Sequence, residues 1–173
     1  MEYRQTMDKL TNQYIIEILE SKFAQNVEIL GEPYDLLTIA ISPSHIIELL
    51  TYLKEEESLR FNYLTDITAV HYPKQEKSFA VVYHLHNLFQ NFRIRIKVFL
   101  EGDRPAIPTA TGIWKGANWM ERETYDFFGI DFQGHPDLRR ILNMDELDVF
   151  PMRREYPLED PNRVDKKDFY FGR

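Results

Sequence analysis

The segment from Phe92 to Val98 constrains the fold more than any other part of this chain. Apolar and basic residues alternate along it, in the order Phe92, Arg93, Ile94, Arg95, Ile96, Lys97 and Val98. Successive side chains of a strand point to opposite faces, so this alternation predicts a strand with one buried face and one polar face. The buried face has to be covered by a second layer of structure.

The rest of the N-terminal part supplies elements that could form this layer and the sheet around it. Apolar residues at helical spacing predict a helix over about 7–24, and a second helix follows Ser42-Pro43 and ends in the acidic run at 55–57. Further strands are predicted over 27–30, 34–41, 63–71 and 79–87. Short connections suit antiparallel pairing, so we expect an α+β fold with an antiparallel or mixed sheet packed with helices.

A third helix is predicted in the C-terminal half. Asn118 followed by Glu121 three residues later is the capping-box pattern, and Gly129 is a good left-handed C-cap. Beyond it the chain is rich in proline and mixed charge. We therefore expect an α+β domain over 1–130, including this helix, and an extended partner-docking tail over 131–173.

Composition excludes several classes of function. The chain has no cysteine, which rules out disulfides, thiolate zinc sites and cysteine-ligated iron–sulfur clusters. Its net charge of −7 makes it a poor nucleic-acid binder. No secretory signal and no apolar run of membrane-spanning length is visible, so we expect a cytosolic chain that meets a membrane only through partners.

Two groups of residues could carry chemistry. Glu121, Glu123 and His135 offer the carboxylates and imidazole of a proton-transfer site. His84 and His86 lie two apart on a predicted strand and could form a metal pair, but no third ligand is apparent from spacing.

Each group also has a structural interpretation. Carboxylates near the start of a helix are favoured by its dipole, and the planar donors of Arg122, Arg139 and Arg140 could pair with them. Polar residues on the open face of a strand would account for the histidines. We prefer the structural interpretation in both cases.

Aromatic residues gather around the third helix and in the tail. Most of those near the helix should be core, and several could anchor a partner: Trp114, Trp119, Tyr125, Phe127, Phe128 and Phe132. The tail segment 149–160 combines prolines with Arg153, Arg154 and Tyr156. Such an extended segment cannot bury itself, so we expect it to dock on a neighbouring subunit rather than to remain a free terminus.

The run from Glu121 to Leu142 resembles the signature of the 30 kDa subunit of respiratory complex I, which in bacteria is the C subunit of NADH-quinone oxidoreductase. The matching residues are Glu121, Arg122, Glu123, Asp126, Gly129, Ile130, Gly134, His135, Pro136, Asp137, Leu138, Arg139 and Arg140. The tail departs from the family pattern, since Val149-Phe150 stands where many members carry Gly-His before the proline.

The resemblance implies a cofactor-free subunit of the hydrophilic arm, peripheral on the cytoplasmic face of the cell membrane. Its partners would be the large quinone-site subunit and the cluster-bearing subunits, and flavin and iron–sulfur clusters would reside in those partners. The motif, together with Arg153, Arg154 and Tyr156, would form the subunit interface. The complex would oxidise NADH, reduce a quinone and translocate protons.

Three alternatives remain open at this point. The chain could be the equivalent subunit of a membrane-bound nickel–iron hydrogenase complex, which carries a similar subunit. It could be a stand-alone acid/base enzyme using Glu121, Glu123 and His135, which would require an enclosed pocket around them. It could also be a binding module that belongs to no enzyme complex.

Overall fold

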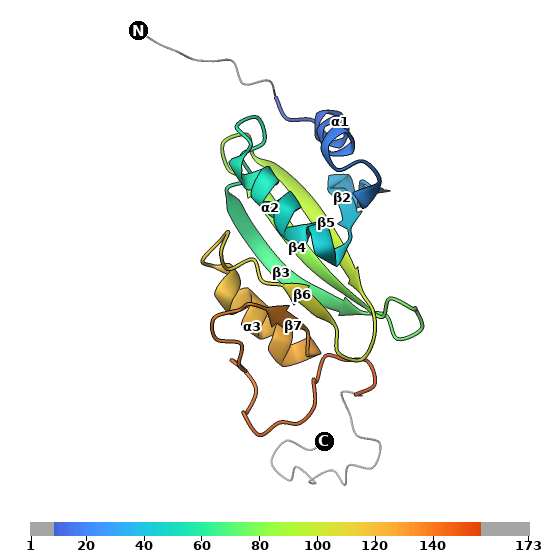
Figure 1. The fold of residues 1–173 in the computed structure, drawn as a ribbon, viewed down its shortest axis with the longest axis vertical. Coiled ribbons are helices and arrows are strands. Elements are labelled where there is room, and N and C mark those ends of the chain that lie inside the picture. The colour runs from blue at the N-terminus through green and yellow to red at the C-terminus, as the bar shows by residue number, and fades with distance from the viewer. Residues whose placement is uncertain (1–8, 157–173) are drawn as a thin grey trace, which may run out of the picture.

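The computed structural model describes residues 9–156, so the sequence predictions for 1–8 and 157–173 lie outside the described residues. The helices and strands follow one another along the chain as Figure 1 shows. They are α1 (Asn12–Phe23), β1 (Val27–Gly31), β2 (Leu37–Ile41), α2 (Ile46–Glu55), β3 (Tyr63–His71), β4 (Phe79–Asn87), β5 (Phe92–Leu100), β6 (Ala106–Pro108), α3 (Ala117–Phe128) and β7 (Asp131–Gln133).

Five strands form one mixed sheet in the order β1-β2-β5-β4-β3. The β2–β5 pair is parallel and the other neighbours are antiparallel. A largely antiparallel sheet packed with helices makes the protein α+β, which confirms the predicted fold class.

The alternation in β5 defines the two faces of this sheet. Ile94, Ile96 and Val98 are completely buried on one face, as predicted. The intervening Arg93, Arg95 and Lys97 lie on the other face. The strand also runs two residues further than predicted, to Leu100.

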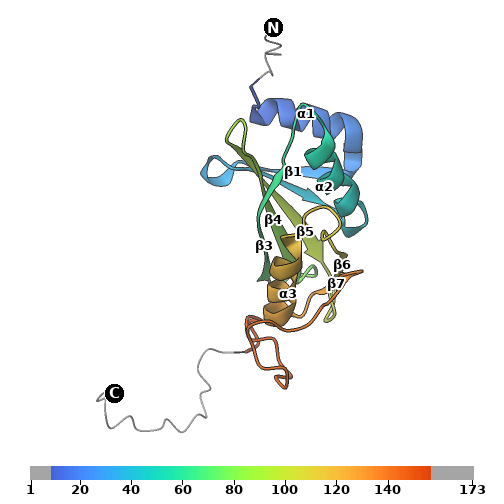
Figure 2. The same ribbon diagram turned by 90° about the vertical axis from the view of Figure 1, so that its left-hand side faces the viewer.

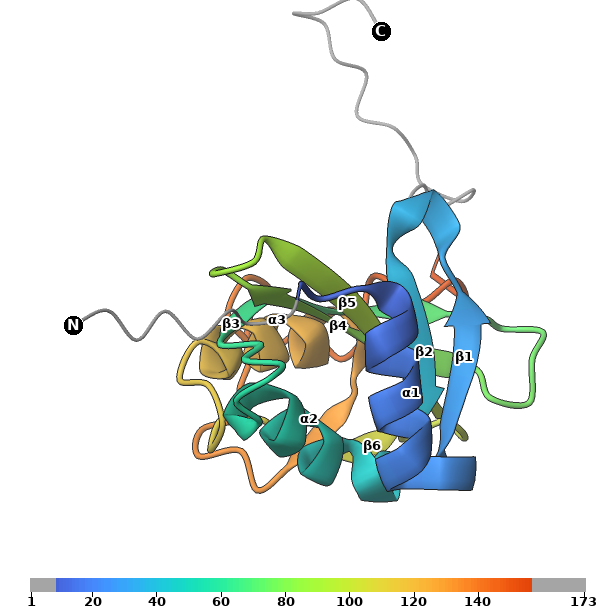
Figure 3. The ribbon, with the colours of Figure 1, turned by 90° about the horizontal axis from the view of Figure 1, so that it is seen from above.

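All three helices lie on the same side of this sheet (Figures 2 and 3). One continuous apolar core fills the space between them and the buried face of the strands. α3 packs against β3, where the hydroxyl of Thr124 donates to the carbonyl of Ile67 at 3.3 Å. No described residue forms a helix on the opposite face, which we call the helix-free face.

A second, two-stranded parallel sheet brackets α3. β6 precedes the helix and β7 follows it, with Ile107 opposite Phe132 and both side chains buried. The N–H of Thr109 also donates to the carbonyl of Gln133 at 3.0 Å. The loop before α3 and the chain after it are thereby held side by side.

Backbone conformation explains where two elements begin later than predicted. α1 begins at Asn12 because the hydroxyl of Thr11 caps it, accepting from the N–H of Tyr14 at 3.2 Å. β2 begins at Leu37 because Tyr34 and Asp35 have φ angles of 60° and 59°, which a strand cannot contain.

The predicted capping box at Asn118 is wrong. The N-cap of α3 is Gly116, two residues before the predicted one, and glycine has no side chain to cap with; the helix itself begins at Ala117. Glu121 does not fold back to Asn118, because its carboxylate is bound in the protein interior. The predicted C-cap is confirmed, since Gly129 has φ 70° and its N–H bonds to the carbonyl of Tyr125.

Candidate functional site

The Glu-Arg-Glu motif lies in the middle of α3, and its three side chains point in different directions. Glu121 is 0% exposed and Arg122 is 7% exposed, whereas Glu123 is exposed to solvent. Residues two apart on a helix point in nearly opposite directions, so Glu121 and Glu123 do not converge on one point.

Glu121 fastens the loop before α3 to the helix. Its Oε1 accepts from the N–H of Ala110 at 2.6 Å, and its Oε2 accepts from the hydroxyl of Thr109. Burial raises the pKa of Glu121 to about 7, with these two donors acting in the opposite direction. The nearby Tyr83 hydroxyl is buried and has no hydrogen-bond partner in residues 9–156, and its pKa is raised by burial and by Glu121.

Asp126 organises the chain that follows β7. One carboxylate oxygen accepts the backbone N–H groups of residues 141–143 at 2.8–3.0 Å. The other accepts from Arg140 Nη1 at 2.7 Å and from the Asn143 amide at 3.0 Å. Burial acts to raise the pKa of Asp126, but these donors outweigh it and hold the pKa well below the ordinary range.

Arg140 completes this arrangement from the loop itself. Its side chain is 9% exposed. Besides pairing with Asp126, it donates to the backbone carbonyls of Leu147 and Val149, and its guanidinium lies 5.1 Å from the Phe150 ring. Residues 139–150, which we call the anchored loop, therefore keep their shape although they contain no helix or strand.

Arg122 binds the same loop from the helix side. It donates from Nε to the carbonyl of Arg139 at 3.2 Å and from Nη2 to that of Arg140 at 3.1 Å. The Trp119 ring lies 5.2 Å from its guanidinium carbon. Trp119 consequently lies beside the anchored loop.

The Gly-His-Pro-Asp turn is also held internally. His135 Nδ1 accepts the N–H of Asp137 at 3.0 Å, so Nε2 carries the hydrogen and donates to the carbonyl of Asn118 at 3.1 Å. Pro136 is exposed, and Asp137 forms an exposed 2.9 Å ion pair with Arg139. Both imidazole nitrogens are thus used in positioning the turn.

Arg153 fastens the beginning of the tail to the domain. Its Nε donates to the carbonyl of Phe128 at 2.7 Å, and its guanidinium lies 4.9 Å from each of the Phe79 and Phe150 rings. Gly129 makes this approach possible, because a Cβ at that position would collide with the Phe150 ring and the Arg153 guanidinium.

The next residues bind the end of β3. The N–H of Arg154 donates to His71 Nδ1 at 3.0 Å, and the His71 ring stacks on Phe79 at 4.4 Å. Burial lowers the pKa of His71, which favours the neutral form whose Nδ1 accepts from Arg154. The Glu155 carboxylate lies 3.4 Å from the same nitrogen and receives no hydrogen bond from it in that form. Tyr156 is 40% exposed at the limit of the described chain.

The predicted site residues therefore divide into two sets. Those that hold the chain together are Glu121, Arg122, Asp126, Gly129, His135, Arg140 and Arg153. Those with exposed side chains or surfaces are Glu123, Gly134, Pro136, Asp137, Arg139, Arg154 and Tyr156.

Three exposed apolar side chains lie in and beside the anchored loop. Trp119, Leu142 and Met144 are 61%, 64% and 70% exposed, and we call them the apolar patch. Of the three, only Trp119 was predicted from the sequence as a possible partner anchor. Apolar residues within a polar, proline-flanked segment were the signal that could have identified Leu142 and Met144.

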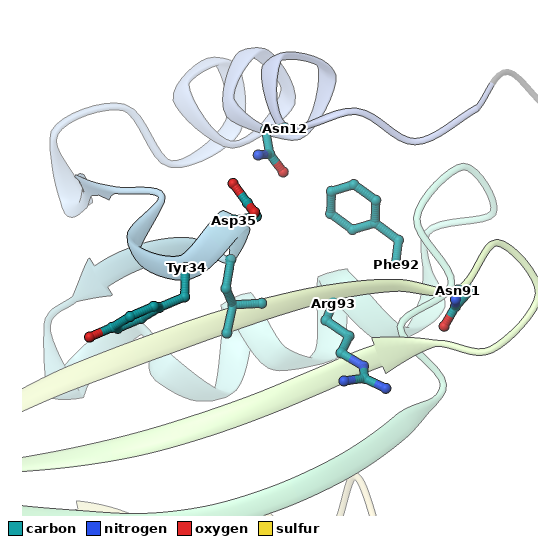
Figure 4. A pocket seen from close by; sticks show the side chains of 7 residues that line it. Asn12, Tyr34, Asp35, Asn91, Phe92 and Arg93 are labelled. Carbon is teal, nitrogen blue, oxygen red and sulfur yellow. The ribbon is translucent and has the colours of Figure 1, made fainter.

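The acid/base alternative lacks the geometry it requires. Glu121 is enclosed by Thr109 and Ala110, Glu123 faces solvent, and His135 is bonded to backbone. One large hollow, of about 610 Å³, lies elsewhere, between the start of α1, the β1–β2 turn and the start of β5 (Figure 4).

His84 and His86 share one face of β4, as predicted, but each imidazole is hydrogen-bonded to the side chain of another residue. Arg95 Nε donates to His84 Nε2 at 2.9 Å, and His86 lies 3.0 Å from the side-chain oxygen of Asn91. Within residues 9–156, no three histidine or acidic side chains are grouped as metal ligands would be. The same residues contain no helix with the length and hydrophobicity needed to cross a bilayer.

Comparison with known proteins gives close relatives. Residues 39–162 match the family model described as respiratory-chain NADH dehydrogenase, 30 kDa subunit. An NADH-quinone oxidoreductase C subunit of Rhizobium etli is 44% identical over 138 residues, which are 79% of this chain and 73% of the relative. The corresponding C subunit of Citrifermentans bemidjiense is 41% identical over 152 residues, which are 88% of this chain and 93% of the relative.

Two solved structures share the fold. The trypsin-resistant fragment of Nqo5 superposes with a TM-score of 0.63 at 32% identity, covering 72% of this chain and 98% of the fragment. A chain of the membrane-bound sulfane sulfur reductase, an archaeal respiratory membrane complex, superposes with a TM-score of 0.73 at 25% identity, covering 93% of this chain and 96% of that chain.

Proposed function

The chain belongs to the family of the 30 kDa subunit of respiratory-chain NADH dehydrogenase, and we propose that it is a cofactor-free docking subunit in the hydrophilic arm of a proton-translocating NADH:quinone oxidoreductase. It contributes no reacting group of its own. It packs against the quinone-site subunit and helps to hold that subunit in place. The names of the relatives at 41–44% identity support this assignment.

The apolar patch carries the proposal. Trp119 exposes a large apolar side chain on α3. Leu142 and Met144 do so on the anchored loop, which the Asp126–Arg140 pair fastens to that helix. Exposed apolar residues on a rigid support are typical of a protein interface, because docking there loses little conformational entropy. Tryptophan and arginine are the residues most often found at the energetic centre of such an interface.

Composition supports the absence of a cofactor in this chain. No cysteine is present to ligate an iron–sulfur cluster, and His135 and Glu121 are committed to internal hydrogen bonds. In the proposed complex, flavin and iron–sulfur clusters would belong to partner subunits. The chain is held peripherally at the cytoplasmic face of the membrane by those partners.

Sequence similarity favours the respiratory complex over the hydrogenase alternative. The two relatives named above, at 44% and 41% identity, carry the NADH-quinone oxidoreductase name, and neither name mentions a hydrogenase. A binding module that belongs to no enzyme complex is disfavoured, because both relatives are named as subunits of NADH-quinone oxidoreductase.

Truncation of the tryptophan tests the proposal. Trp119→Ala removes a ring that is 61% exposed and that contacts the Arg122 guanidinium in the described part of the chain, so the fold should survive. We expect it to weaken assembly by about 2 kcal/mol or more, roughly 30-fold in dissociation constant. The measurement is the amount of quinone-site subunit retained by the tagged full chain in detergent-solubilised membranes.

Tyr34→Ala is the matched control. Tyr34 is an aromatic side chain that is 97% exposed and lies far from α3, beside the hollow in Figure 4. It should leave the amount of retained quinone-site subunit unchanged. If Trp119→Ala retained its partners as fully as Tyr34→Ala, the apolar patch would not be the docking surface.

A further inference from the structure

The helix-free face of the main sheet carries a line of positive charge. Arg93, Arg95 and Lys97 occupy alternate positions of β5 and therefore all lie on this face, and we call them the cationic row. Their spacing along the strand is about 7 Å. This is unexpected in a chain whose net charge is −7.

The central member of the row is held in position. Asp66, His84 and Arg95 lie opposite one another on β3, β4 and β5. Arg95 Nε donates to His84 Nε2 at 2.9 Å, so the hydrogen of His84 is on Nδ1, which lies 3.6 Å from the Asp66 carboxylate. Within residues 9–156 the terminal nitrogens of Arg95 have no hydrogen-bond partner and remain free for a planar acceptor.

The outer two members of the row have no charge partner. Neither Arg93 nor Lys97 forms an ion pair or a side-chain hydrogen bond with any residue between 9 and 156. Arg93 points away from α1, whereas the preceding Phe92 points towards that helix (Figure 4). The neighbours of Lys97 across the sheet are Val82 and Ala40, which offer no carboxylate.

We propose that the cationic row binds an extended acidic segment of a neighbouring subunit. Alternate residues of an extended chain are spaced by the same distance as alternate residues of β5. Carboxylates at alternate positions of the segment would thus pair with Arg93, Arg95 and Lys97, the Arg95 contact being bidentate. The proposal assumes that the chain works within a complex, and it defines a second interface, on the face opposite α3.

Amine labelling of Lys97 in the assembled complex tests this directly. Lys97 should react with an amine-directed acylating reagent in the free full chain and lose that reactivity in the complex. The exposed Lys74, in the turn between β3 and β4, is an internal control that should react in both. A carbodiimide should in addition join Lys97 to an aspartate or glutamate of another subunit.

Charge reversal supplies the second measurement. Arg93→Glu/Lys97→Glu should cause loss of the partner that cross-links to Lys97, while the partner of the apolar patch is retained. Lys74→Glu/Arg104→Glu makes the same charge change at two other exposed positions and should lose neither. Neither variant changes His84 or Arg95. The two isolated variant chains should therefore unfold at the same temperature.

Several results would overturn the proposal. Full reactivity of Lys97 in the complex would show that this face is open. Protection already present in the free chain, or a cross-link to this chain's own 157–173, would show that no partner is needed. Protection in the complex without a carboxylate cross-link would show that the occupant is not acidic. Failure to isolate any complex would instead count against the proposed function.

Discussion

The pKa values of two buried carboxylates on α3 are shifted in opposite directions, because the two groups accept different numbers of hydrogen bonds. Burial raises the pKa of Glu121 to about 7, since two hydrogen bonds do not offset desolvation. Burial acts in the same sense on Asp126, but the N–H groups of residues 141–143 and Arg140 hold its pKa well below the ordinary range. Asp126 therefore stabilises the fold above its unfolded pKa and loses that contribution as the pH falls. Glu121 binds its proton more tightly when folded, so its contribution declines as the pH rises from about 4.5 to about 7.

Neutralising Glu121 should alter the pH dependence of stability. Glu121→Gln keeps an acceptor for the N–H of Ala110 and removes the buried charge. Relative to the wild type, the variant should gain up to about 3 kcal/mol between pH 5 and pH 8. Urea unfolding of the full chain at both pH values measures this. If the difference in unfolding free energy between the variant and the wild type were the same at both pH values, the raised pKa of Glu121 would be contradicted.

Removing the charge of Asp126 should release the anchored loop. In Asp126→Asn the nearly buried Arg140 loses its counter-charge, and the amide repels at least one of the N–H groups it now faces. We expect a loss of about 3 kcal/mol. Hydrogen exchange should accelerate first at residues 141–143. Asp137→Asn, which breaks an exposed ion pair, is the control and should have little effect. Unchanged exchange at residues 141–143 would contradict the anchoring role.

At the scale of elements, the strands of the main sheet could be predicted from sequence, whereas their order in the sheet and the anchored loop could not. The alternation in β5 is itself the consequence of one buried face, so the pattern identifies the strand and its orientation. Arg140, in contrast, binds backbone carbonyls of residues 147 and 149, and a carbonyl has no sequence signature. The capping box failed for a related reason, since a buried N–H at Ala110 competed for Glu121. Residue types were thus informative about which groups matter but not about their partners.

Alanine substitutions of two glycines distinguish backbone strain from a side-chain collision after α3. Gly129 and Gly134 both have positive φ, so alanine at either position should cost about 1 kcal/mol in backbone strain. At Gly129 the new Cβ also collides with Phe150, whereas at Gly134 it only touches Thr109 at 3.5 Å. Gly129→Ala should therefore cost roughly 2–4 kcal/mol and displace the tail. Equal losses in thermal unfolding would mean that the close approach of Phe150 does not matter.

At the scale of the whole molecule, the motif has an internal and an external role. Its buried members Arg122 and Asp126 fasten the anchored loop to α3. Trp119, Leu142 and Met144 are thereby presented on one supported surface. The cationic row lies on the other side of the same sheet. With both proposed interfaces occupied, the chain would lie between two neighbours and hold them at a set distance.

Purification of the tagged full chain from mild detergent extracts tests the central claim most directly. We predict that it returns the quinone-site, flavin-bearing and cluster-bearing subunits together, with NADH:quinone oxidoreductase activity in the complex. The separated chain should contain neither flavin nor iron. A chain that purifies alone, or that carries a stoichiometric prosthetic group or turnover of its own, would contradict the account.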